Sequence, residues 1–149
     1  MNEGLDIIII DDDAAVCEVI HEIIKRFYVW GNIHAFTDVD EAIEFCLSRE
    51  SGLAIFIVDI YLAGISGFSF LDTISEKYPS AHEDSVVITG NASDDVVNAC
   101  VASDVNHLLE KPIRPYALQL AVRSIINKYL KFAKKLLQDP AFARHIPLF

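Results

Sequence analysis

The sequence predicts a doubly wound α/β fold, with a five-stranded parallel sheet between two layers of helices and an extended C-terminal helix. Five short apolar segments, rich in Ile and Val, alternate with stretches whose apolar residues recur every three or four positions. Such segments are typical of strands buried on both faces and of amphipathic helices, respectively. The connections are short, so each helix carries the chain across the sheet to a strand of the same direction.

The first two strand–helix units occupy the first third of the chain. Residues 6–10 form an apolar strand, and the helix after it begins where a carboxylate, Asp13, can cap the free N–H groups. Residues 32–36 are expected to form a second, shorter strand. Asp38 then caps a helix whose apolar residues have the same spacing.

The remaining strands are predicted at residues 54–58, 86–88 and 105–109. The helix after the third strand begins at Ser66 and must end before Pro79, because the residue before a proline disfavours helical backbone angles. Ser93 caps a short helix after the fourth strand. A long helix follows the fifth strand from about Pro115.

Length and composition indicate one acidic domain. A chain of 149 residues can close one hydrophobic core. Its longest aliphatic run, residues 7–10, is far shorter than the roughly 20 residues of a membrane-spanning helix. The acidic N-terminus does not resemble a signal peptide, and a formal net charge of −10 disfavours direct nucleic-acid binding. We expect a soluble, cytoplasmic protein, with no membrane association, whose three separated cysteines are buried free thiols.

Charged and hydroxyl side chains follow four of the five predicted strands. They are Asp11 and Asp12 after the first strand, Asp59 after the third, Thr89 after the fourth and Lys111 after the fifth. Because the carboxyl ends of parallel strands lie along one edge of a sheet, these side chains should converge there. A single acid at a strand end is usually a turn or a helix cap, but the whole set in this order points to a site.

The set suits phosphoryl chemistry. Crowded carboxylates raise one another's pKa unless a cation lies between them, and oxygen-rich sites of this kind favour Mg²⁺. With the cation present, Asp59 can act as the nucleophile toward a phosphoryl group and form an aspartyl phosphate. Lys111 supplies a fixed positive charge, and the hydroxyl of Thr89 can donate a hydrogen bond to a phosphoryl oxygen.

These residues resemble the receiver domain of two-component response regulators over roughly residues 4–127. The matching positions are the acidic pair Asp11 and Asp12, Asp59, Gly67 eight residues further on, Thr89 with Gly90, and Lys111 with Pro112. The resemblance implies a flavodoxin-like sheet with the strand order 2-1-3-4-5. It also implies that Asp59 is the phosphoacceptor. The combined pattern is specific, although each element alone is weak.

The resemblance further implies a ligand set and a partner. Mg²⁺ (or Mn²⁺) would bind directly to Asp12, Asp59 and the backbone carbonyl of Tyr61, with Asp11 acting largely through water. Thr89, Gly90 and Lys111 would contact the phosphoryl group and form the switch. The phosphoryl donor would be a sensor histidine kinase or a phosphotransfer protein. The domain would catalyse only its own phosphorylation and dephosphorylation, so it is not an enzyme in the ordinary sense.

Three departures from the family pattern affect these expectations. Ala63 replaces the usual proline after the phosphoacceptor, which loosens the loop. Leu108 stands where the family commonly has the aromatic residue of the switch, so the usual readout of phosphorylation is in question. Tyr61 and Asn91 occupy the two positions that tune the phosphoryl lifetime. Because a bulky Tyr61 hinders an attacking water molecule, we predict slow self-dephosphorylation.

The last helix is predicted to run from Pro115 to about Leu137, which is longer than a receiver domain of residues 1–127 needs. Residues 128–149 are therefore interpreted as a helical extension, either an interaction segment or a linker cut before an output domain. An apolar seam with coiled-coil spacing is expected to mediate homodimerisation or partner docking. The seam consists of Ile125, Tyr129, Phe132 and Leu136.

Two features of the extension are less specific. Four lysines, at positions 128, 131, 134 and 135, either form a solvated face that complements the helix dipole or contact an acidic partner. The chain then ends in an apolar tail. The tail contains Phe142, Ile146, Leu148 and Phe149.

Two other classes of function stay open. The first is a phosphorylation-independent interaction module that keeps only the receiver fold, which Leu108 leaves possible. The second is an aspartate-nucleophile phosphatase of the haloacid-dehalogenase type. That class needs a second aspartate two residues after the nucleophile, and Tyr61 stands there instead.

Overall fold

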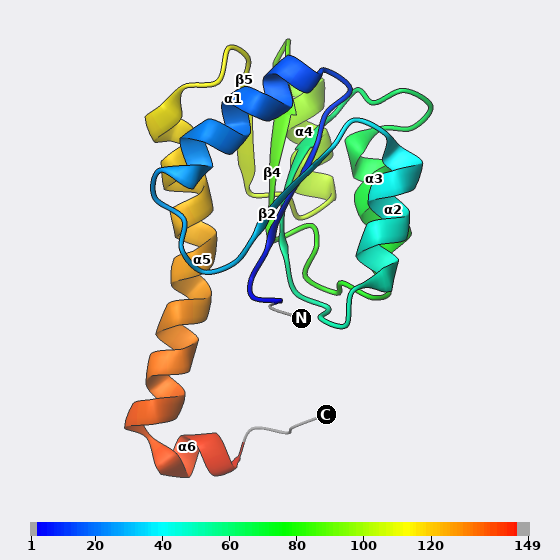
Figure 1. The fold of residues 1–149 in the computed structure, drawn as a ribbon. Coiled ribbons are helices and arrows are strands. Elements are labelled where there is room, and N and C mark those ends of the chain that lie inside the picture. The colour runs from blue at the N-terminus through cyan, green and yellow to red at the C-terminus, as the bar shows by residue number, and fades with distance from the viewer. Residues whose placement is uncertain (1–2, 146–149) are drawn as a thin grey trace.

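The computed structural model describes residues 3–145 and has the predicted fold (Figure 1). All strand pairs are parallel and the sheet has the order β2-β1-β3-β4-β5. The strands are β1 (Ile7–Ile10), β2 (Ile33–Phe36), β3 (Ile55–Asp59), β4 (Ser85–Thr89) and β5 (His107–Glu110). The helices are α1 (Ala14–Lys25), α2 (Val39–Ser48), α3 (Gly67–Ile74), α4 (Asp94–Ala102), α5 (Pro115–Gln138) and α6 (Pro140–Arg144).

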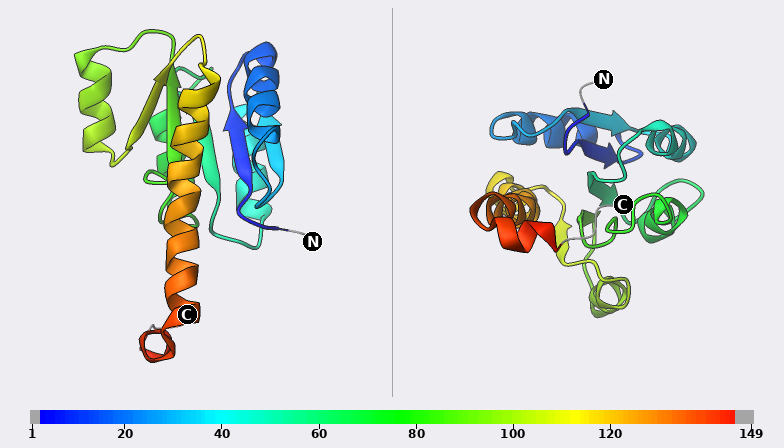
Figure 2. Two further views of the ribbon diagram at one scale, coloured as in Figure 1. Left: turned by 90° about the vertical axis from the view of Figure 1, so that its left-hand side faces the viewer. Right: turned by 90° about the horizontal axis from the view of Figure 1, so that it is seen from below.

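The helices form two layers, with α1 and α5 on one face of the sheet and α2, α3 and α4 on the other (Figure 2). The alternation of side chains along β1 shows why both faces are apolar. Ile7 and Ile9 belong to the core with α1 and α5, whereas Ile8 and Ile10 belong to the core with the other three helices. A strand that supplies two cores must be apolar at every position, which explains the unbroken Ile run.

Side chains cap four helices at the residues that the sequence predicts. Asp13 accepts a hydrogen bond from the N–H of Ala15, and Asp38, Ser66 and Ser93 do the same at the starts of α2, α3 and α4. These bonds satisfy N–H groups that have no partner within the helix. Helix α5 has no side-chain cap and instead begins with Pro115, whose fixed backbone angle suits a first helical turn.

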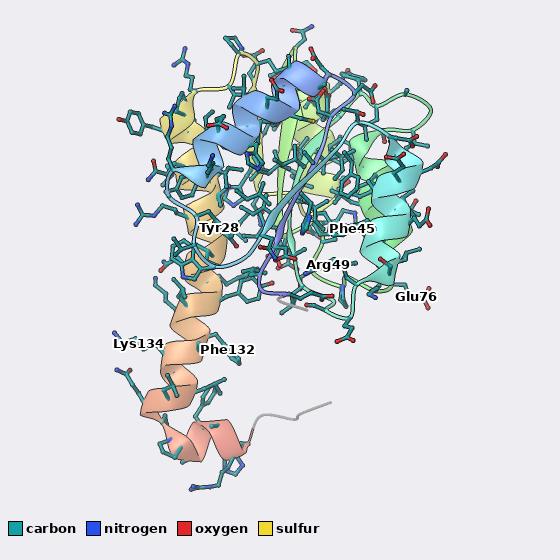
Figure 3. The ribbon with its side chains drawn as sticks, viewed as in Figure 1. Tyr28, Phe45, Arg49, Glu76, Phe132 and Lys134 are labelled. Atoms are coloured by element: carbon teal, nitrogen blue, oxygen red, sulfur yellow. The ribbon has the colours of Figure 1, made fainter. Side chains whose placement is uncertain are left out.

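A polar cluster fills the edge of the sheet opposite to the strand ends that carry the acids. Arg49 is buried and pairs with buried Asp6 at 3.3 Å, and it donates a second hydrogen bond to the hydroxyl of Tyr78 at 3.1 Å (Figure 3). Tyr78 in turn donates to the carbonyl of Cys46 at 2.7 Å. The cluster joins α2 to the chain before β1, and its buried charges are paired as burial requires.

Helix α5 leaves the body of the domain halfway along its length and is followed by α6 (Figures 1 and 2). Its first half is anchored by Leu118, Val122 and Ile125, which are nearly inaccessible to solvent. Beyond the body, the ring of Phe132 meets that of Phe142 edge-on with the ring centroids 6.3 Å apart. Helix α6 therefore packs back against the end of α5.

The predicted association seam is divided by this arrangement, which corrects the expectation for two of its residues. Ile125 is 3% exposed in the core, so it is not available to a partner. Tyr129 is half-buried and bonds to Asp84, which follows α3 and precedes β4. Phe132 and Leu136 remain on the part of α5 beyond the body. Ile146, Leu148 and Phe149 of the predicted tail lie outside the described residues.

Two further expectations concern cysteines and membranes. Cys17, Cys46 and Cys100 are all buried and free, as predicted. Burial raises the pKa of the Cys46 thiol to about 12, so this group stays protonated. Among the helices of residues 3–145, none combines the length and the apolar character that crossing a bilayer requires.

Candidate functional site

Asp59 is the last residue of β3 and is only 7% exposed at the carboxyl edge of the sheet. Its carboxylate has two partners from different parts of the chain. Oδ2 lies 2.7 Å from the ammonium Nζ of Lys111, and Oδ1 accepts a hydrogen bond from the backbone N–H of Tyr61 at 2.9 Å. The nucleophile predicted from the sequence is thus held at both oxygens.

Lys111 joins two carboxylates, because its Nζ also lies 3.1 Å from Oδ2 of Asp11. Asp11 follows β1 and is buried, and its Oδ1 accepts a hydrogen bond from the N–H of Asp13 at 2.8 Å. Burial raises the pKa of Asp11, and the nearby charge of Asp59 adds to this. Burial alone would lower the pKa of Lys111, but its hydrogen bond to Asp59 and its ion pair with Asp11 outweigh that effect and raise it. Lys111 therefore stays charged between two acids.

The backbone fixes Lys111 at this position. Its N–H donates to the carbonyl of Thr89 at 2.8 Å, which extends the pairing of β4 with β5 past the end of the strand. The Lys111–Pro112 peptide bond is cis. All five parallel strands end at one edge of the sheet, where β1 and β3 are neighbours and β4 separates β3 from β5. This shared edge brings together residues 48 and 52 positions apart in the sequence.

Thr89 is fully buried at the end of β4, and its hydroxyl is engaged within its own loop. It accepts a hydrogen bond from the N–H of Asn91 at 3.2 Å and donates one to the carbonyl of Asn91 at 3.3 Å. Gly90, between them, is exposed, and a Cβ atom there would meet nothing within 4 Å. The hydroxyl of Thr89 therefore already has partners within its own loop.

Asp12 differs from Asp11 in its surroundings. It is exposed and lines a hollow of about 500 Å³ together with the loops after β2 and β3, including Thr37, Ala63 and Gly64. Neighbouring residues at a strand end point in opposite directions, which explains why Asp11 faces Lys111 and Asp12 faces the hollow. The loosened loop at Ala63 forms one wall of this hollow.

The donor set fits a hard cation of the Mg²⁺ class. Asp11 and Asp59 carry two negative charges and share one ammonium, so the pair keeps an excess negative charge. Within residues 3–145, no three His, Cys, Asp or Glu side chains are grouped so that they could hold a metal ion by themselves. A cation here would need backbone carbonyl, water and phosphoryl oxygens as well, and this is the coordination that Mg²⁺ prefers.

The structure explains why residue 67 is a glycine. It begins α3, and a Cβ atom at this position would lie 2.4 Å from the backbone oxygen of Asp59. Its N–H donates to the carbonyl of Ile60 at 2.8 Å. Any side chain here would displace the strand end that carries Asp59, so glycine is required for a close approach of two backbone segments.

The side chains of Tyr61 and Leu108 have different environments: Tyr61 is exposed, and Leu108 packs against the core. Tyr61 is 67% exposed, and its backbone N–H contacts Asp59. Leu108 lies in β5 opposite Val87 and packs against the core shared with α2, α3 and α4. Its aliphatic side chain carries no polar group that could respond to a movement of Thr89.

Sequence reasoning missed Glu110, which precedes the lysine. Its Oε2 accepts a hydrogen bond from the N–H of Ala92 at 2.9 Å, so it holds the loop between β4 and α4 that also contains Asn91. The acid is visible in the sequence, but its partner is not, because the bond depends on the register of β4 against β5. In that register Thr89 is opposite Glu110.

Comparisons with known proteins agree with this geometry. A family model described as the response regulator receiver domain matches residues 7–123. The heme response regulator HssR of Staphylococcus epidermidis is 22% identical over 125 residues, which cover 84% of this chain and 53% of HssR. A cyclic di-GMP phosphodiesterase of Thermotoga maritima is 28% identical over 142 residues, which cover 88% of this chain and 36% of that protein. The chain thus spans about half or less of these relatives.

Solved structures share the fold at low sequence identity. The BeF3-activated DrrB receiver domain has a TM-score of 0.70 and 18% identity, with 83% of this chain and 98% of that chain covered. A CheY-like receiver domain protein from Methanospirillum hungatei has a TM-score of 0.72 and 18% identity, with coverage of 87% and 98%. The beryllofluoride-activated NtrC4 receiver domain dimer has a TM-score of 0.72 and 19% identity, with coverage of 83% and 98%.

Proposed function

The chain belongs to the response regulator receiver domain family, and we propose that it accepts a phosphoryl group on Asp59 from the phosphohistidine of a sensor histidine kinase or phosphotransfer protein. The observation that carries this proposal is the bridge that Lys111 forms between the carboxylates of Asp59 and Asp11. A nucleophile, a second acid and a fixed cation lie within hydrogen-bonding distance at one sheet edge. This combination supports transfer of a phosphoryl group to a carboxylate.

The transfer step uses a carboxylate oxygen of Asp59 as the nucleophile. The oxygen attacks phosphorus, the P–N bond of the phosphohistidine breaks, and its electron pair remains on the imidazole nitrogen of the donor. The product is an acyl phosphate on Asp59. Lys111, already charged and in contact with Oδ2, neutralises part of the charge that spreads over the phosphoryl oxygens.

We propose Mg²⁺, or Mn²⁺, as the cofactor of this step. The side chains of Asp12 and Asp59 and the carbonyl of Tyr61 would hold it, with Asp11 acting through water. When bound, the cation supplies positive charge for the acids and the phosphoryl oxygens. Asp12 is exposed, whereas Asp11 is held by its ion pair with Lys111 and by the hydrogen bond from the N–H of Asp13.

Signalling would follow from exchange of the hydrogen bonds of Thr89. On phosphorylation its hydroxyl leaves Asn91 and donates to a phosphoryl oxygen, with the exposed Gly90 leaving room for the loop to move. The new state biases a pre-existing conformational equilibrium. Leu108 gives no aromatic readout, so the β4–α4 loop itself carries the change.

The organisation of the chain follows from this function. Residues 1–127 would form the receiver, and residues 128–149 a helical extension that associates with a partner or a second copy. The matched regions cover 53% and 36% of the curated relatives. We therefore propose the association of residues 128–149 as the output of this chain alone. Turnover of an external substrate is not expected, and the exposed Tyr61 replaces the acid that a haloacid-dehalogenase-type phosphatase would need.

A phosphorylation-independent interaction module is the second candidate function. The observation that favours it is the aliphatic packing of Leu108, which removes the usual connection between the site and the surface of β5. Such a module would bind its partner equally well with Asp59 or with Asn at this position. Partner binding by wild type and Asp59→Asn therefore distinguishes the two functions.

Intact mass after incubation with acetyl phosphate tests the phosphoacceptor proposal directly. Wild type should gain one phosphoryl group only when Mg²⁺ is present, and Asp59→Asn should gain none. Asp95→Asn, at an exposed acid in the first turn of α4, is the matched control and should react like wild type. No adduct on folded wild type with metal bound would overturn the proposal.

A further inference from the structure

The charge of the chain is distributed very unevenly between its two parts. Residues 1–127 contain seven of the 12 Lys and Arg residues and 21 of the 22 Asp and Glu residues, which gives them a formal charge of −14. Residues 128–149 contain five basic residues and one acidic residue, a formal charge of +4. The extension is therefore a basic arm on a strongly acidic body.

The lysines of the arm are not neutralised by their own chain, with one exception. Lys128 pairs with Asp84 at 2.5 Å. Within residues 3–145, Lys131, Lys134 and Lys135 are exposed and take part in no ion pair. Lys134 and Phe132 leave α5 on opposite sides (Figure 3).

The positions of Lys128, Lys131 and Lys135 are three and four residues apart, so they form one stripe along α5. This stripe borders a hollow of about 500 Å³, and both aromatic and basic side chains line it. The hollow is lined by Ser80, Lys128, Tyr129, Lys131, Phe132 and Lys135. Phe132 is 45% exposed, so the surface offers apolar area next to its charges.

The complementary surface is on α2. Asp40, Glu41 and Glu44 are exposed on its outer side, and within the described residues none of them forms an ion pair. Leu47, one turn further on, is 51% exposed and adds apolar area to this acidic stripe. The arm stripe thus offers two unpaired lysines beside exposed Phe132, and the α2 stripe offers three unpaired acids beside exposed Leu47, so the charges are opposite.

The two surfaces cannot meet within one molecule. Helix α2 covers one face of the sheet and α5 the other, and the arm extends away from the body (Figures 1 and 2). We infer that the lysine stripe of the arm docks on the acidic face of α2 in a second copy of this chain. This inference rests on the proposed association of residues 128–149 and names its surfaces, and it requires neither phosphorylation nor a bound metal.

A second copy presents the arm with a matching surface. At physiological ionic strength charges act over about 8 Å, so the local charges of the two stripes decide the contact, and the net charges of the two copies matter less. In a second copy, unpaired acids of α2 lie beside exposed Leu47, which matches the lysines and Phe132 of the arm. Because the two surfaces differ, each copy keeps one free surface of each kind after the first contact, and association can continue beyond a dimer.

Sedimentation velocity of the unphosphorylated full chain tests the inference by charge reversal. Wild type should self-associate, and added salt should weaken this association. K131E/K135E on the arm and E41K/E44K on α2 should each weaken it by about tenfold or more. A mixture of the two variants should associate again, because the reversed charges are complementary. E18K/E22K, the same charge change on exposed positions of α1, is the control.

Three results would overturn the inference. They are a wild type that stays monomeric up to about 1 mM, the weak limit of specific binding, association that either double variant leaves unchanged, and a mixture of variants that does not associate. Binding of an unrelated acidic protein to the arm, without self-association, would also overturn the inference, because the partner of the arm would then be a different protein. Circular dichroism confirms that all variants are folded. None of these results bears on phosphorylation of Asp59, so the two proposals fail separately.

Discussion

The phenol of Tyr129 in α5 donates a hydrogen bond to the buried carboxylate of Asp84, which also pairs with Lys128 at 2.5 Å. Asp84 directly precedes β4, the strand that ends in Thr89. Two consecutive residues of α5 therefore satisfy a carboxylate that is 1% exposed. This contact fixes the helix at the point where it leaves the body.

Tyr129→Phe should lower the free energy of unfolding by about 1.5 kcal/mol, because it removes a donor from a buried, charged acceptor. Urea denaturation measures this change. Tyr116→Phe is the matched control, since Tyr116 is 85% exposed and its loss should change the free energy by less than about 0.5 kcal/mol. Equal effects of the two substitutions would show that the contact with Asp84 does not stabilise the fold.

The same residue should make stability depend on alkaline pH. Burial of the phenol, and then its hydrogen bond to Asp84, raise the pKa of Tyr129. In the unfolded chain a tyrosine ionises near pH 10, whereas folded Tyr129 keeps its proton beyond that pH. The stabilisation is thus complete below about pH 10 and is lost as the pH rises above it.

Urea denaturation at about pH 8 and about pH 11 should therefore show a smaller loss of stability in Tyr129→Phe than in wild type. Part of the loss should remain in the variant, because burial also raises the pKa of Tyr28. An identical loss in both proteins would mean that Tyr129 ionises like a free tyrosine.

Lys111→Met should impair both stability and phosphorylation. It leaves Asp11 and Asp59 without their shared cation, and without divalent metal the free energy of unfolding should fall by about 1–2 kcal/mol. Labelling by acetyl phosphate should slow by about 100-fold, the usual effect of losing one charge-stabilising group. Lys131→Met, at an exposed position, should leave both quantities unchanged. Normal labelling of Lys111→Met would remove Lys111 from the proposed mechanism.

Gly67→Ala and Gly90→Ala form a matched pair. A Cβ at residue 67 would lie 2.4 Å from the backbone oxygen of Asp59, whereas one at residue 90 would meet nothing within 4 Å. Gly67→Ala should therefore cost about 1–3 kcal/mol of stability, as overpacking does, and Gly90→Ala less than about 0.5 kcal/mol. Thermal unfolding of the two variants checks this, and a stable Gly67→Ala would show that the strand end can shift.

Tyr61→Ala should shorten the lifetime of the phosphoryl group on Asp59. A bulky side chain two residues after Asp59 is expected to hinder an attacking water molecule. Because Tyr61 is exposed, its removal should speed hydrolysis several-fold without changing stability. Loss of the phosphoryl group in Mg²⁺, followed by intact mass, measures both rates. A half-life of only seconds in the wild type would contradict the expected slow dephosphorylation.

The positions of the strands and the helix caps could be predicted because they depend on local sequence, whereas the strand order came from the family resemblance. The Ile run of β1 and the acids or serines before α1 to α4 act within a few residues of their partners. The convergence of Asp11, Asp59 and Lys111 could be predicted as well, since it follows from parallel strands ending at one edge.

Other features depend on contacts that the sequence does not specify. The different directions of Asp11 and Asp12 follow from where the pleat of β1 ends, and the bond from Ala92 to Glu110 follows from the register of two strands. The pairing of Arg49 with Asp6 spans 43 residues. The association seam was predicted from spacing alone, which could not show that Ile125 lies inside the body.

The division of α5 between body and solvent gives the arm a mechanical property. Its first half is held in the core, and the 11 residues from Lys128 to Gln138 extend about 16 Å at 1.5 Å per residue. A continuous helix transmits a rotation without bending at its base. A tilt of about 10° where Tyr129 contacts Asp84 would displace the far end by roughly 3 Å, comparable to the rise of two residues. A rigid helix held at this point would therefore turn a small movement of the sheet into a larger displacement of α6.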